Sequence, residues 1–348
     1  MYESMLEWLV CPSCYDSNLS LDTSHLKGVE VMDGTLVCQS CNTTYPIKDG
    51  IPRFIRRSVS SNEIKSQIRN ANIQFYDSAA VHYEAGVDQR EHQSEFNQNR
   101  IESIIKSLSN KTHGSSFLDV GCGTGNLLKY GSKYFARAIG ADVSVEMLKK
   151  AREKGCEVVQ AEALNLPFKC DTFNVVSIFS VLHHLYDYKP FFEEASRVLK
   201  SGGFLYADWD PVKPPKIDTK KISWRTFRII KTIAKPLMKL AKRPFEQGVA
   251  NVREPEPEVK KIAELAEYHN STTNECERGI DIDEIKSSLD KNGFTDTQFS
   301  FHCAGRTLAQ LKPIEKIKFF FFKFQDYPVE RFAENIMVIA QRGNNESR

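Results

Sequence analysis

The stretch Phe117–Asn126 reads FLDVGCGTGN, and it decides the fold class of this chain. Its first four residues form a short, mostly apolar run that predicts a β-strand. Glycines then follow at alternate positions, Gly121, Gly123 and Gly125, and a helix is expected to begin near Leu127. Glycine lets a backbone approach a ligand closely, and the start of a helix presents unpaired N–H groups. The segment therefore predicts a ligand-binding turn between a strand and a helix.

One acidic residue in this stretch narrows the choice of ligand. Dinucleotide-binding enzymes use a similar turn, so three glycines alone are weak evidence. Here Asp119 precedes the first glycine, and the third glycine comes two residues after the second rather than three. A carboxylate repels a pyrophosphate but attracts a cationic amino-acid group. The turn is thus expected to bind a ligand that carries an ammonium group.

The segments that follow alternate between strand and helix patterns. Residues 138–142 read as a strand that ends in Asp142, an acid of the kind that binds ribose hydroxyls. Ser144 is expected to cap a helix over Val145–Lys154. Such alternation predicts a doubly wound parallel sheet of the α/β class. The other expected elements are strands that begin near Val158 and that span 173–179, 204–207, 298–302 and 335–340, and helices over 95–109, 191–199 and 282–291.

Residues 117–210 resemble the class I methyltransferases, type 11-like, that depend on S-adenosylmethionine (SAM). The matching motifs are LDVGCGTG at 118–125, EALNLPF at 162–168, VLHHL at 181–185 and RVLKSGG at 197–203. The resemblance implies a Rossmann-like sheet of seven strands, closed by an antiparallel pair made of the last two expected strands. It also implies SAM as the cofactor.

The resemblance assigns cofactor contacts to individual residues. Glu162 stands where the family more often has Asp, so its assignment departs from the common pattern. The implied residues are Asp119 at the amino group, Gly121, Gly123 and Gly125 at the methionine end, Asp142 at the ribose, Glu162 and Ala163 at the adenine, and Phe179 and Ser180 beside the methionine portion.

Catalysis in such an enzyme needs a nucleophile held in line with the methyl group in a dry pocket. A general base is needed only where the nucleophile starts protonated. The acceptor is expected beyond the carboxyl ends of the fourth and fifth parallel strands, faced by His184, Asp208, Trp209 and Asp210. His184 is the candidate catalytic base; the alternative is that it only packs at a strand end.

Two cysteine pairs near the N-terminus predict a metal site. Cys11 and Cys14 form one C-x2-C pair, Cys38 and Cys41 form a second, and 23 residues separate the two pairs. Two such pairs can close a tetrahedral site of four thiolates, which suits structural zinc and leaves no open position. The alternatives are four unrelated thiols or two redox-active pairs.

Residues 1–55 resemble the small zinc-ribbon family that activates tRNA and translation-factor methyltransferases. The shared features are CPSC at 11–14, YPI at 45–47 and DGIP at 49–52. The resemblance implies that the ribbon does no chemistry, covers an apolar face of its methyltransferase, and is fused here ahead of that partner. The expected organisation is a ribbon over 1–55, a linker over 56–72, and a methyltransferase domain over 73–348 with helical lid insertions at about 212–278 and 304–332.

Positive charge is concentrated in the first insertion. The whole chain has a net charge of +2, yet residues 212–250 hold eleven Lys and Arg against two Asp and Glu. Residues 222–243 show the pattern of a basic amphipathic helix over the acceptor opening. It could contact a membrane surface or an anionic lipid-linked substrate, bind RNA phosphates, or be an ordinary surface helix. In the second insertion, Phe319–Phe324 suggests a further apolar face near the opening, the alternative being core packing.

Three functions are compatible with these features. The first hypothesis is a SAM-dependent methyltransferase for a small or lipid-linked metabolite, supported by the two insertions. The second is an RNA or translation-factor methyltransferase with its activator fused in cis, supported by the ribbon. The third is a SAM-binding module without catalysis. The chain of 348 residues lacks both an apolar stretch of membrane-spanning length and a secretory signal, so a cytoplasmic location is expected, with 222–243 as a site of peripheral membrane contact.

Overall fold

The computed structural model describes residues 1–55, 64–83, 94–212, 279–302 and 335–343. The predicted basic helix at 222–243 and the segment Phe319–Phe324 lie outside these residues. Among the described helices, none is long and apolar enough to cross a membrane.

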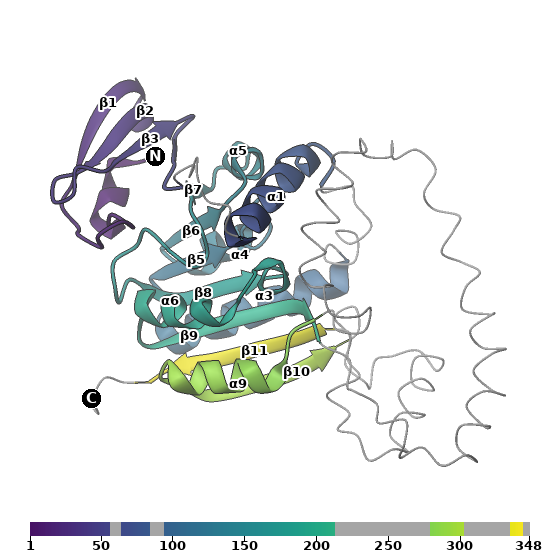
Figure 1. Ribbon diagram of the computed structural model, residues 1–348. Helices are drawn as coiled ribbons and strands as arrows, with labels where there is room; N and C mark the ends of the chain where they lie inside the picture. The colour runs from purple at the N-terminus through teal and green to yellow at the C-terminus, as the bar shows by residue number, and fades with distance from the viewer. Residues whose placement is uncertain (56–63, 84–93, 213–278, 303–334, 344–348) are drawn as a thin grey trace, which may run out of the picture.

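An antiparallel sheet forms the N-terminal domain, which is drawn in purple in Figure 1. Its strand order is β1-β2-β3-β4, so each strand pairs with the next one along the chain. Gly34 in β2 would bring an added Cβ within 2.5 Å of the Asp22 carbonyl oxygen, so a glycine is required there for close pairing with β1. The elements are η1 (Glu3–Trp8), β1 (Leu19–Lys27), β2 (Glu30–Cys38), β3 (Thr44–Lys48) and β4 (Ile51–Pro52).

The main sheet has seven strands in the order β10-β11-β9-β8-β5-β6-β7. The five strands from β5 to β9 run parallel, and β10 and β11 pair antiparallel at one edge. The expected seven-stranded sheet of the α/β class is thereby confirmed. The strands are β5 (Ser116–Val120), β6 (Arg137–Asp142), β7 (Glu157–Gln160), β8 (Phe173–Phe179), β9 (Leu199–Pro211), β10 (Phe294–His302) and β11 (Asn335–Arg342).

Helices cover both faces of this sheet (Figure 1). On one face α3 contacts α4, and on the other α6 contacts α9. Side-chain caps define several helix starts: Ser144 accepts a hydrogen bond from the Met147 N–H, and Asp281 accepts from the N–H groups of Asp283 and Glu284. The helices are α1 (Ile64–Ala79), α3 (Glu95–Thr112), α4 (Leu128–Tyr134), α5 (Val145–Glu153), η3 (Leu182–His184), α6 (Lys189–Val198) and α9 (Ile282–Lys291).

Helix α1 occupies part of the expected linker. It starts at Ile64, so residues 64–72 of the expected linker are helical. Ile68 and Ala71 are buried one turn apart, and α1 lies beside α5. The mostly polar composition of this stretch concealed the helix, because its inward face also carries polar side chains, such as Asn72, that line a cavity.

The N-terminal domain packs directly on the β7 edge of the main sheet. Backbone bridges join Leu9 to Phe168 and Arg53 to Gln160. The Trp8 ring meets Phe173 edge-on at 5.5 Å between ring centres. One continuous cluster of buried apolar side chains extends from this domain into the main sheet. The two domains therefore share a hydrophobic core.

Candidate functional site

Two adjoining cavities lie at the carboxyl ends of the central parallel strands. The first, of about 230 Å3, is lined by Asp142, Glu162, Ala163 and His184, with residues of α1 covering it. The second, of about 280 Å3, is lined by Asp119 and the glycine turn. This position agrees with the general rule that open α/β sheets bind ligands outside the carboxyl ends of their strands.

The predicted ribose acid, Asp142, is held in place by backbone donors. Its Oδ2 accepts a hydrogen bond from the Gly123 N–H at 2.8 Å, and its Oδ1 accepts from the Ser144 N–H at 2.8 Å. Desolvation by burial raises the pKa of this carboxyl group. Asp142 thus ties the glycine turn to the end of β6 and presents a carboxylate to the first cavity.

The predicted ammonium partner, Asp119, is 2% exposed and lines the second cavity. Its Oδ1 accepts a hydrogen bond from the Ser177 hydroxyl at 2.7 Å. Burial raises the pKa of this carboxyl group to about 7. A desolvated acid of this kind gains most from a cationic ligand, because the cation restores the charged form that burial disfavours.

The three glycines of the turn have different surroundings. Gly121 has φ of +72°, and an added Cβ would come within 2.3 Å of Val181 Cγ2. Gly121 and Gly123 line both cavities. Gly125 lines neither; an added Cβ there would lie 3.0 Å from Cys156 Sγ. Its small size allows the turn to pack against the end of α5, where an added Cβ would also lie 3.2 Å from Ala151 Cβ.

The predicted adenine residues lie on the loop after β7. Glu162 and Ala163 both line the first cavity. The Arg69 Nη1 of α1 donates to Glu162 Oε1 at 2.6 Å, so an ion pair covers this side of the cavity.

Phe179 ends β8 and Ser180 follows it, and both line the two cavities, as does Tyr83. Ser180 adopts φ of +58°, a conformation that few residues other than glycine take. Its N–H donates to the Asp208 carbonyl oxygen at 2.8 Å. The end of β8 is therefore fixed by its neighbour β9.

The candidate base His184 lines the first cavity and contacts a tyrosine. Its Nε2 and the Tyr76 hydroxyl form a hydrogen bond of 2.8 Å. Burial, together with the neighbouring His183, lowers the pKa of His184 well below its ordinary value. The imidazole is therefore neutral at neutral pH and able to accept a proton.

The other residues expected at the acceptor opening are buried, which corrects that expectation. Asp208 is 0% exposed and forms an ion pair with Arg100 of α3 at 2.8 Å. Trp209 stacks on Phe179 with 5.7 Å between ring centres. Asp210 is buried beside His183, whose Nδ1 lies 2.7 Å from Asp210 Oδ1. Half-buried partners from α3 and η3, Arg100 and His183, hold the two carboxylates inside the molecule.

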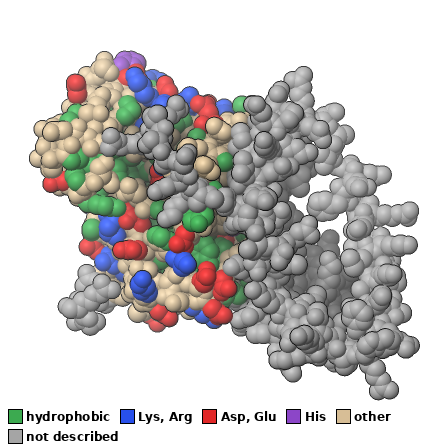
Figure 2. Space-filling view, in the orientation of Figure 1, with side chains coloured by type: hydrophobic (Ala, Val, Ile, Leu, Met, Phe, Trp, Pro, Cys, Tyr) green, Lys and Arg blue, Asp and Glu red, His purple; other side chains and the backbone are tan. Residues whose placement is uncertain are grey.

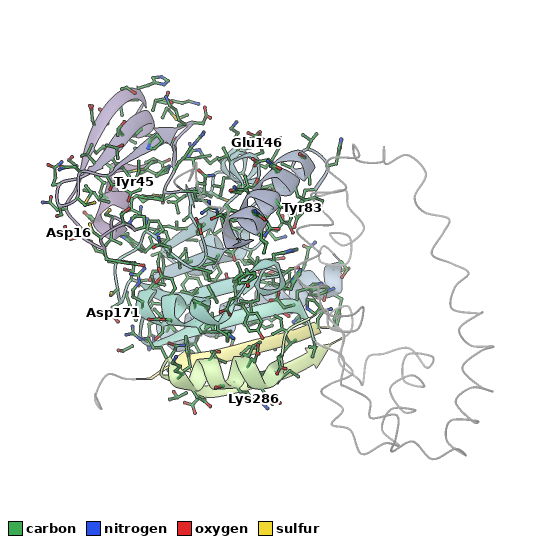
Figure 3. The ribbon with its side chains drawn as sticks, viewed as in Figure 1. Asp16, Tyr45, Tyr83, Glu146, Asp171 and Lys286 are labelled. Atoms are coloured by element: carbon green, nitrogen blue, oxygen red, sulfur yellow. The ribbon has the colours of Figure 1, made fainter. Side chains whose placement is uncertain are left out.

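Helix α1 supplies site residues that sequence reasoning missed. Arg69, Asn72 and Tyr76 lie three and four residues apart, so they share one face of the helix, and all line the first cavity. Tyr83 follows shortly after the helix and lines both cavities; Figure 3 labels it. The helical spacing of polar and aromatic residues over 69–76 was the available signal.

The four cysteines of the N-terminal domain lie together, as predicted. Their sulfur atoms lie within 4.8 Å of one another, with 3.6 Å between Cys11 and Cys41 and 3.6 Å between Cys14 and Cys38. A tetrahedron with zinc–sulfur bonds of ~2.3 Å has edges of ~3.8 Å, so the cluster fits a zinc ion. The Tyr45 hydroxyl lies 3.1 Å from Cys11 Sγ and supports the site from the domain core.

The N-terminal domain also holds the loop that forms the adenine side of the first cavity. The Phe54 N–H donates to the Gln160 carbonyl oxygen at 2.9 Å, just before this loop. At the far end, the Val10 N–H donates to the Pro167 carbonyl oxygen at 3.0 Å. Between them, the Tyr15 hydroxyl donates to Asn165 Oδ1 at 3.0 Å. The loop is thus anchored at its start, middle and end.

Two family matches agree with this architecture. Residues 118–207 match the family described as a methyltransferase domain, and residues 3–50 match the family described as Trm112p-like protein. The chain is also similar to a solved chain from the complex between the Haloferax volcanii Trm112 methyltransferase activator and a methyltransferase, at 13% identity and a TM-score of 0.45, covering 79% of this chain and 99% of that one.

Two curated relatives are methyltransferases by name. The tRNA (carboxymethyluridine(34)-5-O)-methyltransferase of Arabidopsis thaliana is 37% identical over 109 residues, which are 30% of this chain and about a quarter (26%) of that protein. The demethylmenaquinone methyltransferase of Staphylococcus carnosus is 30% identical over 199 residues, which are 53% of this chain and 81% of that protein. With its seven-stranded sheet, glycine turn and cysteine cluster, this chain belongs to the class I SAM-dependent methyltransferases and carries a Trm112p-like domain at its N-terminus.

Proposed function

We propose that this chain transfers the methyl group of SAM to RNA, with its Trm112p-like domain supporting the catalytic domain in cis. The observation that carries the proposal is the pair of adjoining cavities, with a buried acid in one and a second acid in the other. Such a pair would suit a ligand with an ammonium group at one end and ribose hydroxyls at the other. SAM has both groups.

The residues present fit SAM. Asp119 would bind the ammonium group and Asp142 the ribose, while Glu162 and Ala163 would border the adenine. When bound, SAM supplies a methyl group already activated by a positively charged sulfur. What remains for the protein is to orient the acceptor and exclude water, and α1 covers the first cavity for this purpose.

His184 is proposed as the residue that holds the acceptor proton. Its neutral imidazole meets the Tyr76 hydroxyl, and both line the first cavity. A hydroxyl acceptor could pass its proton to Tyr76 while Tyr76 passes its own to His184 Nε2. An acceptor that is already ionised would need only the hydrogen bond from Tyr76.

Three features favour RNA as the acceptor. The Arabidopsis relative is named as a tRNA methyltransferase, and the N-terminal domain matches the Trm112p-like family. The cluster of eleven Lys and Arg within 212–250 would complement RNA phosphates. On the described surface in Figure 2, by contrast, basic and acidic side chains are interspersed.

A small or lipid-linked acceptor is the second candidate. The relative named as a demethylmenaquinone methyltransferase favours it, because this chain covers 81% of that protein. Residues 222–243, with their alternating apolar and basic positions, would then contact a lipid surface.

The test is transfer of isotope from methyl-labelled SAM into a cell extract by the purified full chain. RNA, protein, lipid and small-molecule pools are then separated and counted, with heat-inactivated protein as the blank. Label in RNA that is lost on nuclease treatment supports the proposal. Label in the lipid or small-molecule pool rejects RNA in favour of the second candidate. SAM binding without label in any pool would indicate a binding module without catalysis.

A further inference from the structure

The two cavities share a narrow set of residues. Only Tyr83, Gly121, Gly123, Phe179 and Ser180 line both of them within the described chain. Two of the five are glycines, and Tyr83 and Phe179 are the aromatic members. The junction between the cavities is therefore bordered by two aromatic rings from different elements.

The covalent structure of SAM places its sulfur at this junction. The sulfur joins the 5′ carbon of the ribose to the methionine side chain. With the ribose beside Asp142 in the first cavity and the ammonium beside Asp119 in the second, the sulfur has to lie between them. That atom carries a full positive charge in SAM and none in the product, S-adenosylhomocysteine.

Both rings are held by neighbouring aromatic residues. Tyr83 Cε1 lies 4.0 Å from the position that an added Cβ on Gly123 would take, so the ring lies close to the glycine turn. Tyr76 meets it edge-on, with 6.1 Å between ring centres. Phe179 stacks on Trp209 at 5.7 Å, and the Arg100 guanidinium lies 5.6 Å from the Trp209 ring centre. The rings are thus positioned before a ligand arrives.

We propose that Tyr83 and Phe179 form an aromatic collar that recognises the sulfonium of SAM and distinguishes it from the uncharged product. This inference rests on the proposed SAM site. A cation is attracted to the face of an aromatic ring, most strongly where water is excluded. Methyl transfer removes the positive charge, so this attraction contributes to the binding of SAM and not to the binding of the product.

The test is isothermal titration calorimetry of the full chain with SAM and with S-adenosylhomocysteine. For Tyr83→Leu we expect SAM to bind about 2- to 30-fold more weakly and the product to change much less. Tyr83→Phe keeps a ring and should keep the ratio of the two dissociation constants. Phe179→Leu should independently lower the ratio of the product's dissociation constant to that of SAM. Tyr2→Leu, which removes an exposed tyrosine of the N-terminal domain, should leave this ratio unchanged.

The outcomes separate the collar from the SAM site itself. Equal weakening of SAM and product binding by Tyr83→Leu and Phe179→Leu would mean that the rings only fill space, and the collar would be rejected while the SAM site stands. Unchanged binding of both ligands in both variants would reject it equally. If the unaltered chain binds neither ligand, the proposed function fails and the collar fails with it. Thermal melting of each variant confirms that it is folded.

Discussion

The N-terminal domain and the main sheet are stabilised by different means. The main sheet buries strands on both faces beneath two layers of helices, with β5 buried along its whole length. The N-terminal domain exposes most of β1 and relies on a four-cysteine cluster. A module of about 55 residues can hardly bury enough apolar surface alone, and a metal makes up the difference. The smaller domain nevertheless holds the loop that borders the larger domain's cavity.

The largest expected effect is loss of the metal. Cys38→Ser removes one of the four ligands, and structural zinc contributes about 10–16 kcal/mol in small zinc-dependent modules. We expect the N-terminal domain to unfold and the main sheet to melt at a lower temperature, because the shared core is exposed. Circular dichroism during heating and a colorimetric zinc assay measure the two effects.

The matched control is Cys170→Ser, which changes an exposed cysteine outside the cluster. It should keep the zinc content and melting temperature of the unaltered chain. A Cys38→Ser protein that keeps a folded N-terminal domain without zinc would show that the core alone stabilises it.

A substitution confined to the main sheet, at Asp119, should raise the melting temperature rather than lower it. Asp119→Asn removes a buried carboxyl group whose pKa is raised to about 7. Because the folded-state pKa lies above the unfolded value, ionisation costs stability as the pH rises from about 4 to about 7. We expect the variant without ligand to melt at a higher temperature than the unaltered chain at pH 8 and at a similar one near pH 4.

The same variant should bind SAM about ten- to a hundredfold more weakly, as expected for the loss of one charged hydrogen bond. Titration calorimetry at pH 8 gives this value. Weaker binding with no gain in melting temperature would mean that burial of Asp119 costs less than its raised pKa indicates.

A substitution at the interface between the two domains should destabilise the chain less than loss of the zinc does. Trp8→Ala removes an edge-on contact with Phe173 and the ring beneath the Arg137 guanidinium, which lies 4.7 Å from its centre. Such contacts contribute about 1–3 kcal/mol together. We expect the unfolding free energy to fall by this amount in urea titrations, while Tyr2→Ala has little effect. An unchanged midpoint for Trp8→Ala would argue against coupling through this face.

The smallest expected effect is on how the rate of methyl transfer depends on pH. Burial and His183 lower the pKa of His184, so it stays neutral to a lower pH than an ordinary histidine. If it holds the acceptor proton, the acidic limb of the rate profile should lie below pH 6.5. His184→Gln should abolish that limb, and His25→Gln, in the N-terminal domain, should preserve it. A limb that persists in His184→Gln would assign the proton to another group.

Much of the fold and of the site could be predicted from sequence because strand order and local motifs determine it. Asp119, Gly121 and Asp142 lie at the carboxyl ends of adjacent parallel strands, and such ends meet at one edge of a sheet. The cysteine cluster followed from spacing alone. These predictions needed no knowledge of distant contacts.

The errors arose where distant segments meet. Asp208 and Asp210 were expected at the acceptor opening, yet Arg100 and His183 hold them inside. Trp209, with φ of +66°, interrupts the regular alternation of side chains along β9. Part of helix α1 was missed because its cavity-facing residues are polar. Its sequence therefore lacks apolar residues that recur regularly every three or four positions.

The central claim is that the metal-bearing N-terminal domain and the main sheet form one functional unit around the SAM site. Titration calorimetry of SAM with the full chain, before and after zinc is removed by a chelator, tests it most directly. The account predicts at least tenfold weaker binding without zinc, restored when zinc is added back, because the loop at 161–168 loses its anchors. Equal affinity in protein verified as free of zinc would contradict the claim.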